Sequence, residues 1–330
     1  MTYNWLVNIN SLKFNEKSIL LIGAGVMGEQ FGHALSRMNI TNVTVLSRTE
    51  QKTNNLCKKF NFHPLSGGYK KHLASLEKKD LVIIALPIEL LLPATIATIE
   101  AGQTNILIEK PGSLYSKQLA ALTEKVTHQT IRIAYNRIVY PNFYKLKEIA
   151  EKEGGIISCR YTFTEWIHTL DFSIYSTETL RRWGIANSLH VINMAHELIG
   201  LPKEIFSTQL RGLEWHPSGS VFVGSGISEN KILFSYHADW NSAGRWGIEI
   251  MTYENAYRLI PLEDLYVCPK GSVKWEKVSF DSAYPNVKQG IAEEISVMLT
   301  EEALEKPELI SLEKATAYTQ LAEKIFGYKS

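Results

Sequence analysis

The stretch Ser18-Ile-Leu-Leu-Ile-Gly-Ala-Gly-Val-Met-Gly28 decides the fold of this chain. Its first half is a continuous apolar run, which is typical of a parallel strand covered on both faces. A G-x-G-x-x-G pattern follows at the point where a helix over residues 26–38 is predicted. In this context Gly23 permits a tight turn, Gly25 lets the backbone approach a pyrophosphate, and Gly28 lets helix and strand pack closely. The free N–H groups at the start of the helix favour the same anion.

Strand-like and helical segments alternate outward from this stretch, from residue 18 to about residue 134. The further strand-like runs are residues 43–46, 80–85, 105–108 and 131–134. This alternation predicts a doubly wound parallel sheet. We therefore expect an α/β fold whose residues 1–140 form a dinucleotide-binding Rossmann domain.

The pattern changes after residue 144, where strand-like segments arrive with few helices between them. These segments are residues 156–163, 221–223, 231–236, 247–251 and 253–260. A helix over residues 187–199 interrupts them, and charged helices over 287–302 and 312–324 close the chain. We expect residues 141–330 to form an α+β domain with a largely antiparallel open sheet, used for substrate binding and oligomerisation. The C-terminal helix is a candidate for packing back on the first domain.

The composition excludes several classes of protein. The chain has 35 basic and 34 acidic residues, so its net charge of +1 gives no electrostatic reason to expect nucleic acid or an anionic membrane as partner. The longest apolar stretch, residues 81–94, is too short and too interrupted to span a bilayer. We also expect no signal peptide, because residues 1–17 contain no apolar core. We expect a cytoplasmic protein.

Metal and disulfide chemistry have no support in the sequence. Cys57, Cys159 and Cys268 are far apart and form no CxxC pair, which fits a reducing compartment. No HExxH or compact ligand cluster occurs, so we predict no catalytic metal.

The end of the second strand bears on the choice of cofactor. An NAD enzyme usually carries Asp or Glu there to bond the ribose 2′-hydroxyl, but this chain has Ser47-Arg48-Thr49. No carboxylate would repel a 2′-phosphate, the two hydroxyls are donors, and Arg48 is a planar cation. This favours NADP over NAD. The alternative is that Arg48 is a solvated residue at the start of a helix.

Three later motifs resemble one family. Glu109-Lys110-Pro111 follows the fourth strand, Tyr135-Asn136-Arg137 follows the fifth, and a helix carries His190. Together with the glycine pattern, their order and spacing resemble the glucose–fructose oxidoreductase / inositol dehydrogenase family (Gfo/Idh/MocA) from Ile19 to about Gly200. The resemblance implies a Rossmann domain, a second domain with an open antiparallel sheet often used for oligomerisation, and hydride transfer between NAD(P) and a sugar, cyclitol or related carbinol.

Lys110 suits the chemistry that the resemblance implies. Hydride transfer to a ketone builds negative charge on oxygen, which needs a proton donor or a cation nearby. Lys110 lies at the carboxyl end of a strand, where α/β sheets place ligands, and Pro111 rigidifies the backbone after it. In the family the matching lysine reaches both nicotinamide and substrate. The alternative is a surface lysine on a loop.

His190 is the second catalytic candidate. In the family a histidine at this position acts as general acid/base or binds the reacting hydroxyl, a role that a near-neutral pKa suits. This chain departs from the family pattern in having Ala186 and Asn193 where many members carry Asp one turn before and one turn after the histidine. Either Lys110 and His190 suffice, or the substrate differs, or the activity is weak. We expect these two residues to converge on one cleft from the two domains.

The remaining candidates complete two sets. The residues expected to contact the dinucleotide are Gly23, Gly25, Val26, Met27, Gly28, Ser47, Arg48, Thr49, Leu86, Pro87, Glu109, Lys110, Asn136 and Arg137. The residues expected to line a polar, aromatic substrate cavity are Glu165, Trp166, His168, Arg182, Trp183, Asn187, His237 and Arg245.

The sequence thus predicts an NADP-dependent oxidoreductase that acts on a sugar-like substrate, with surface polysaccharide synthesis as a possible setting. It also predicts a homo-oligomer formed through the sheet of the second domain. The alternatives are an enzyme of the same family that acts on a cyclitol or an imine, and a catalytically silent NADP-binding sensor or scaffold.

Overall fold

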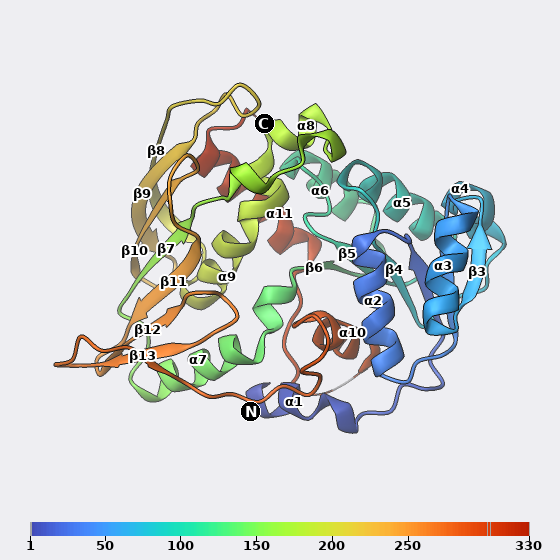
Figure 1. The fold of residues 1–330 in the computed structure, drawn as a ribbon, viewed down its shortest axis with the longest axis horizontal. Coiled ribbons are helices and arrows are strands. Elements are labelled where there is room, and N and C mark those ends of the chain that lie inside the picture. Colours follow the sequence, from blue (N-terminus) through green and yellow to red (C-terminus); the bar gives the residue numbers. More distant parts are fainter. Residues whose placement is uncertain (1, 302, 304, 330) are drawn as a thin grey trace. The chain divides into compact units, whose positions relative to one another are not determined.

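The computed structural model describes residues 2–301, 303 and 305–329. The chain forms two compact units, each built around a sheet of its own (Figure 1). The first unit runs to Val139 and resumes over Ser282–Thr316, and the second comprises Tyr140–Asp281 and the chain from Ala317 onward.

The first unit contains a six-stranded sheet in the order β3-β2-β1-β4-β5-β6, and every pair of neighbours is parallel. The strands are β1 (Ile19–Ile22), β2 (Val43–Ser47), β3 (His63–Ser66), β4 (Leu81–Ile84), β5 (Asn105–Glu109) and β6 (Thr130–Ala134). All four residues of β1 and all four of β4 are buried, as their apolar runs predict. The strand order reverses at β1, so the doubly wound parallel sheet is confirmed.

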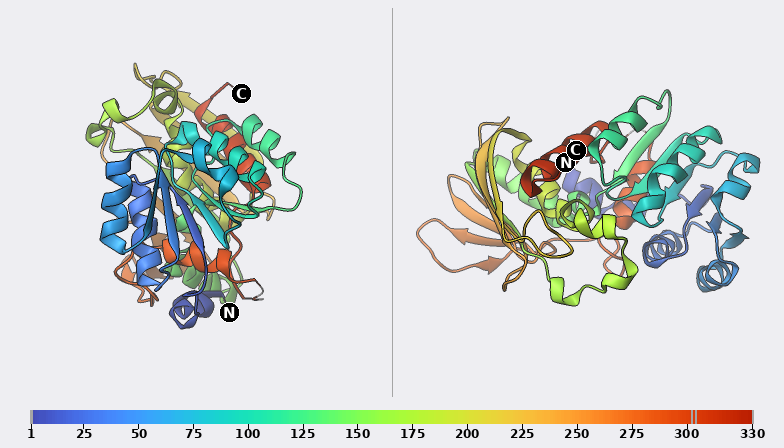
Figure 2. Two further views of the ribbon diagram at one scale, coloured as in Figure 1. Left: turned by 90° about the vertical axis from the view of Figure 1, so that its right-hand side faces the viewer. Right: turned by 90° about the horizontal axis from the view of Figure 1, so that it is seen from above.

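Helices cover both faces of this sheet (Figure 2). The covering helices are α2 (Val26–Arg37), α3 (Glu50–Phe60), α5 (Ile88–Glu100) and α6 (Ser116–Thr123). Two shorter helices, α1 (Thr2–Val7) and α4 (Tyr69–His72), belong to the same unit. Right-handed crossovers that run outward from β1 in opposite directions place α2 and α3 on one face and α5 and α6 on the other.

The chain returns to the first unit late in the sequence, which differs from the expected division at residue 140. The returning helix, α10 (Ile291–Leu299), is buried at every position and packs against α2. Asn105 donates a hydrogen bond to the carbonyl of Met298 (3.0 Å), and Ile133 pairs with Ile310 beside β6. A helix with no solvated face needs cover on all sides, and the first unit provides it.

The second unit contains an eight-stranded sheet in the order β14-β13-β12-β11-β7-β10-β9-β8. The strands are β7 (Ser158–Phe163), β8 (Pro202–Leu210), β9 (Val221–Ser228), β10 (Leu233–Asp239), β11 (Trp246–Met251), β12 (Asn255–Leu259), β13 (Tyr266–Pro269) and β14 (Glu276–Lys277). The β7/β10 pair is parallel and the other pairs are antiparallel, which confirms the predicted largely antiparallel sheet.

The two faces of this second sheet differ. On one face Tyr161, Phe234 and Tyr236 pack beside His196 of helix α9 (Leu189–Ile199). The opposite face exposes large apolar side chains to solvent, namely Phe206, Leu210, Val223, Leu233 and Ile260. The other helices of this unit are α7 (Pro141–Lys152), α8 (Thr177–Arg181) and most of α11 (Leu312–Phe326). Within the described part of the chain, no helix combines the length and the apolar character needed to cross a membrane.

Candidate functional site

The glycine loop joins β1 to α2, as the sequence predicts. Gly23 has a φ of 123°, and a Cβ there would lie 2.1 Å from the carbonyl oxygen of Ala85. A Cβ at Gly28 would lie 2.2 Å from the carbonyl oxygen of Gly23, so these two glycines are required by the protein's own packing. A Cβ at Gly25, the residue that caps α2, would meet nothing within 4 Å. The space over Gly25 and the first turn of α2 is therefore open to a ligand.

A pocket of about 500 Å³ lies at this loop, along the carboxyl ends of β1, β2 and β4. The predicted cofactor residues that line it are Gly23, Gly25, Ser47, Arg48, Thr49, Leu86 and Pro87. Val26, Met27 and Gly28 sit in the adjoining first turn of α2 but do not line the pocket. Glu109, Lys110, Asn136 and Arg137 also lie outside it, at and beyond the ends of β5 and β6.

The charged side chains that line this pocket are all basic. Arg48, Lys52 and Lys70 line it with exposed side chains, and none of its described lining residues is acidic. The Ser47 hydroxyl is occupied within the protein, because it lies 2.6 Å from the Thr53 hydroxyl. Sequence reasoning missed Lys52 and Lys70. Lys52 was detectable, because it lies in the first turn of α3, four residues after Arg48. Lys70 had no such signal, because it comes from the separate short helix α4.

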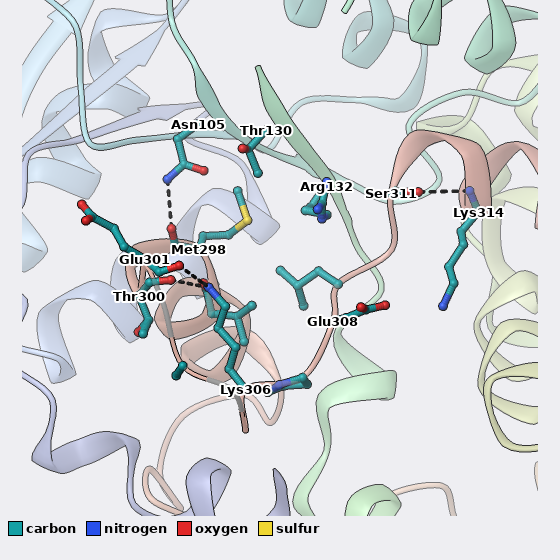
Figure 3. A pocket seen from close by; sticks show the side chains of 14 residues that line it. Asn105, Thr130, Arg132, Met298, Thr300, Glu301, Lys306, Glu308, Ser311 and Lys314 are labelled. Atoms are coloured by element: carbon teal, nitrogen blue, oxygen red, sulfur yellow. Dashed lines mark hydrogen bonds between the residues drawn. The ribbon is translucent and has the colours of Figure 1, made fainter. Parts of the chain in front are cut away.

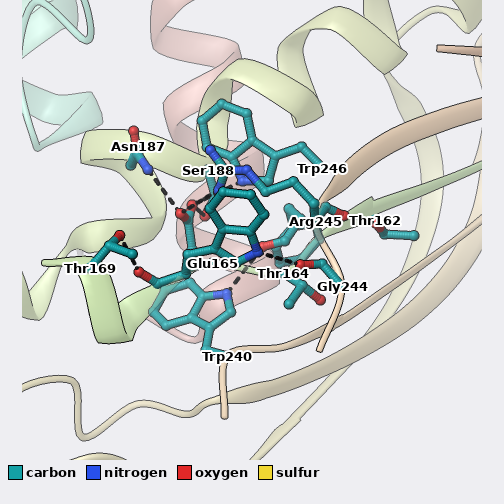
Figure 4. Close-up of polar contacts among 12 residues, drawn as sticks. Thr162, Thr164, Glu165, Thr169, Asn187, Ser188, Trp240, Gly244, Arg245 and Trp246 are labelled. Atoms are coloured by element: carbon teal, nitrogen blue, oxygen red, sulfur yellow. Dashed lines mark hydrogen bonds and ion pairs between the residues drawn. The ribbon is translucent and has the colours of Figure 1, made fainter. Parts of the chain in front are cut away.

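A second polar cluster forms in the second unit around the buried carboxylate of Glu165 (Figure 4). One carboxylate oxygen accepts hydrogen bonds from Ser188 Oγ (2.5 Å) and Trp246 Nε1 (3.2 Å). The other oxygen accepts from Asn187 Nδ2 (2.9 Å) and lies 3.6 Å from the Arg245 guanidinium. Burial raises the pKa of Glu165, and the hydrogen bonds and the Arg245 charge oppose that rise.

Arg245, the cation beside Glu165, is positioned by aromatic side chains. Its guanidinium lies 4.8 Å from the ring centre of Trp166 and 4.4 Å from that of Trp246, so it is held between two indoles. The Trp166 indole is fixed in turn, because it donates a 2.7 Å hydrogen bond to the carbonyl of Gly244. Arg245 remains 38% exposed and Trp166 47% exposed, so this pair presents a rigid cation and an aromatic surface to solvent.

His190 lies beside the same cluster. It is 6% exposed, and its ring centre is 6.0 Å from that of Trp246. The segment directly before its helix, Gly184–Ser188, forms a π-helical turn that supplies Asn187 and Ser188 to Glu165. Such turns recur at functional sites. Gly184 is needed here, because a Cβ would lie 2.4 Å from the Phe326 ring.

The structure does not bring every expected substrate residue to this cluster. His237 alternates with buried Tyr236 on β10 and therefore projects from the opposite face of the sheet. Arg182 is buried and forms a 2.7 Å ion pair with Glu323 of α11, and Trp183 is buried with its ring against Tyr175. His168 is exposed beside Trp166, at a ring separation of 6.4 Å.

Lys110 and His190 belong to different units, the first following β5 and the second on α9. Their convergence on one cleft stays a prediction. Among the described residues, no group of three or more His, Cys, Asp or Glu side chains is arranged to hold a metal ion.

A larger hollow of about 680 Å³ lies at the opposite edge of the first sheet, where β5 and β6 begin (Figure 3). Asn105, Thr130 and Arg132 line it from the sheet. Lys306 also lines it, but its ammonium group donates to the carbonyls of Val297, Thr300 and Glu301 at the end of α10. This hollow is separate from the pocket at the glycine loop, and sequence reasoning did not anticipate it.

Comparison with known proteins supports the same architecture. The family model described as shikimate / quinate 5-dehydrogenase matches residues 6–95, which contain the glycine loop and β1 to β4. No curated protein sequence matches the chain significantly.

Several solved structures share the whole fold. A candidate NADPH-dependent oxidoreductase from Desulfitobacterium hafniense DCB-2 has a TM-score of 0.79 at 16% identity, covering 95% of each chain. A UDP-N-acetylglucosamine 3-dehydrogenase from Acidithiobacillus ferrooxidans has a TM-score of 0.73 at 15% identity, covering 94% of this chain and 97% of that one. A levoglucosan dehydrogenase in complex with NADH and levoglucosan has a TM-score of 0.73 at 18% identity, covering 94% and 96%. This chain thus has the fold in which a Rossmann unit is combined with a unit built on an open, largely antiparallel sheet.

Proposed function

We propose that this chain is an NADP-dependent oxidoreductase of the Gfo/Idh/MocA type that transfers a hydride between nicotinamide and a sugar or sugar-derived carbinol or ketone. The observation that carries the proposal is the pocket at the glycine loop, with its open space over Gly25 and its three cations. These residues fit a dinucleotide with a 2′-phosphate, because a diphosphate meets free helix N–H groups and the extra phosphate meets Arg48, Lys52 or Lys70. One structural neighbour is described as NADPH-dependent and another is a complex with NADH, so the charge pattern of the pocket is the basis for preferring NADP.

The chemistry assigned to the chain follows from two residues. A bound nicotinamide dinucleotide supplies or accepts the hydride. In reduction, Lys110 offers a proton and a positive charge to the oxygen on which negative charge develops. His190 binds the reacting hydroxyl or exchanges its proton.

The cluster around Glu165 is the proposed substrate platform. Trp166 and Arg245 would meet the sugar, the indole against its ring and the guanidinium on its oxygens, while Asn187 lies at their edge. Glu165 supplies a buried carboxylate next to the segment that precedes His190, on a helix where Ala186 replaces the aspartate of many family members. The UDP-sugar and levoglucosan dehydrogenases among the neighbours favour a sugar substrate. We propose surface polysaccharide synthesis in the cytoplasm as the setting of that reaction.

One observation favours a second candidate, a silent NADP-binding sensor or scaffold. The face of α9 that carries His190 has Asn193 instead of a carboxylate, and Ala186 stands one turn earlier. A sensor would bind NADPH without oxidising it in the presence of any keto-sugar, whereas an enzyme would oxidise it with at least one member of a sugar panel.

The exposed apolar face of the second sheet is the proposed oligomer interface. Phe206 is 75% exposed and Leu210 64%, both on β8, and Leu233 on β10 is 63% exposed. Val223, on the strand β9 between them, is 49% exposed. Large exposed apolar patches of this kind mark association sites. Light scattering tests this proposal, and a protein that stays monomeric at micromolar concentrations contradicts it.

The cofactor assignment predicts that NADPH binds tighter than NADH. One charge-assisted contact to the 2′-phosphate is worth roughly 1.5–3 kcal/mol, or about ten- to a hundredfold in affinity. Arg48→Ala should remove much of this preference by weakening NADPH and leaving NADH unchanged. Fluorescence titration of both cofactors measures it, with Arg37→Ala, an exposed arginine at the end of α2, as the matched control. Equal affinity of the wild-type protein for the two cofactors would refute the assignment.

A further inference from the structure

The chain turns sharply at the end of α11, within the second unit. Gly327 has a φ of 66°, and the N–H of Tyr328 donates to the carbonyl of Glu323 (2.9 Å), which is the hydrogen bond of a Schellman closure. A Cβ at Gly327 would collide with the side chain of Gln209 on β8, so a glycine is needed at this turn. The closure places Tyr328, the residue after it, against the segment that precedes α9.

The hydroxyl group of Tyr328 has two partners. It accepts a hydrogen bond from the backbone N–H of Gly184 (2.9 Å) and lies 2.6 Å from Nε2 of His216. The other ring nitrogen of His216, Nδ1, lies 2.6 Å from the carbonyl oxygen of Gly219, and it carries the ring proton because a carbonyl can only accept. Burial lowers the pKa of His216 to about 4, so its ring is neutral at pH 7 and Nε2 accepts the proton of the Tyr328 hydroxyl. The direction of both hydrogen bonds at this hydroxyl group is therefore fixed.

Gly184 is the first residue of the π-helical turn and also the residue that closes it. Its N–H donates to Tyr328, and its carbonyl accepts from the N–H of Leu189, which is the i→i+5 bond of a π-helix. Asn187 and Ser188 lie inside this turn and donate to the buried carboxylate at the centre of the platform (Figure 4). The hydrogen bond from Gly184 to Tyr328 thus holds the turn that aims both donors.

We propose that Tyr328 is a positioning residue for the substrate platform. Its hydroxyl group holds Gly184 and thereby keeps Asn187 and Ser188 directed at Glu165, so that the platform is in place before a sugar binds. The proposal rests on the proposed function, in which the platform around Glu165 meets the sugar.

The ring of Tyr328 has partners that do not involve its hydroxyl group. It stacks on Phe326 with ring centres 5.4 Å apart, and the guanidinium of Arg182 lies 4.9 Å from its centre. A phenylalanine at this position would keep both contacts, because neither uses the phenol oxygen. The substitution Tyr328→Phe therefore separates the role of the hydroxyl group from the packing of the ring.

Loss of the hydroxyl group acts first on Gly184. This glycine is buried, and a buried backbone N–H that loses its acceptor is unfavourable, so the turn should shift toward the hydrogen bonding of an ordinary α-helix. Such a shift changes the direction in which Asn187 and Ser188 point. Helix α9, by contrast, is buried at ten of its eleven residues, so it should keep its position and that of His190.

NMR spectroscopy of Tyr328→Phe tests the proposal without a substrate. The indole N–H of Trp246 donates to Glu165 (3.2 Å), so its resonance, assigned with Trp246→Phe, reports on that carboxylate. We expect this resonance to shift in Tyr328→Phe. The indole resonance of Trp166, which donates to the carbonyl of Gly244, should stay in place.

Tyr318→Phe is the matched control. It removes another buried hydroxyl group of α11, one that donates to Glu197 (2.7 Å) near the far end of α9. The chemical change and the loss of one buried hydrogen bond are the same as in Tyr328→Phe, but the π-helical turn is not involved. Both indole resonances should therefore stay unchanged in this control.

Kinetics with a keto-sugar that the protein reduces give the second readout. In Tyr328→Phe the KM for the sugar should rise about tenfold while kcat stays within about twofold, because the platform binds the sugar whereas Lys110 and His190 serve its reacting oxygen. Affinity for NADPH should be unchanged, since the cofactor pocket belongs to the first unit. His216→Phe keeps an aromatic ring but offers the Tyr328 hydroxyl no acceptor, so it should change the sugar KM in the same direction. The double variant should be little worse than Tyr328→Phe alone, because both changes break one chain of hydrogen bonds.

The outcomes separate this proposal from the proposed function. An unmoved Trp246 resonance, or an unchanged KM for a sugar that the protein reduces, overturns the positioning role of Tyr328. Equal changes in Tyr318→Phe also overturn it, because they would reflect a general loss of stability. If the wild-type protein reduces no keto-sugar, the proposed function fails, and the Trp246 resonance still decides whether Tyr328 holds the cluster around Glu165. If Tyr328→Phe does not fold, His216→Phe provides the same two readouts.

Discussion

Replacing Lys110 by alanine is expected to lower the kcat for keto-sugar reduction by about a hundredfold or more. Affinity for NADPH should change much less, because the negative charge that Lys110 offsets develops on the substrate oxygen only in the transition state. Steady-state kinetics, together with a fluorescence titration of NADPH, separates the two effects.

Lys117→Ala is the matched control, since Lys117 is an exposed lysine on α6 of the same unit and should be neutral to substitution. A Lys110→Ala variant that keeps most of its turnover would show that another group serves the substrate oxygen. Additivity with His190→Ala tests whether the two residues act on one transition state, because groups that act as a unit give strongly non-additive losses.

Replacing Arg182 by alanine is expected to destabilise the second unit by about 3–5 kcal/mol, because it leaves the buried carboxylate of Glu323 without its partner. The two side chains are 7% and 8% exposed and 2.7 Å apart. Arg182 also donates to the carbonyl of Lys329 (3.0 Å) and stacks on the ring of Tyr328 at 4.9 Å. The residue expected from the sequence to bind substrate therefore ties the C-terminal end of the chain to α8.

Urea unfolding of the variant measures this loss. The adjacent Arg181 is exposed, so Arg181→Ala serves as the control and should cost less than about 0.5 kcal/mol. A loss below 1 kcal/mol for Arg182→Ala would mean that the pair is worth no more than a surface salt bridge.

The first sheet was predictable because its strands carry a local signal. The apolar runs of β1 and β4 are buried on both faces, and the glycines after β1 have steric roles that hold wherever this turn occurs. β3 was missed, since His63 and Pro64 give a short edge strand no apolar pattern. β8 was also missed, because Phe206 and Leu210 occupy the face that a solvated strand would give to polar residues.

The late return to the first unit had no signal in the sequence. Glu293 and Glu294 made α10 look like a solvated, charged helix, yet both side chains are buried. The surface that covers a helix is set by contacts with segments distant in the sequence. The spacing of apolar residues along the helix does not reveal those contacts. The strand ends of the cofactor pocket were predictable for the converse reason, since parallel strands place their carboxyl ends at one edge.

For the cluster around Glu165, the sequence predicted candidate residues but not which of them lie together. Glu165, Asn187 and Arg245 were candidates from the sequence, and the structure joins them. The sequence could not distinguish them from His237 and Arg182. The sheet face on which His237 lies and the ion pair that Arg182 forms both depend on the tertiary structure. Ser188 was overlooked, although it donates a hydrogen bond to Glu165, as Trp246 does.

Hydride transfer between nicotinamide and a sugar carbon is the reaction that we propose for this chain. The most direct measurement uses NADPH carrying deuterium at C4, incubated with the protein and a panel of keto-sugars, followed by mass spectrometry of the products. We predict that at least one sugar alcohol gains a single deuterium at its former carbonyl carbon, and that this product is lost in Lys110→Ala. Tight binding of NADPH without deuterium in any product would contradict the proposed reaction and favour the sensor.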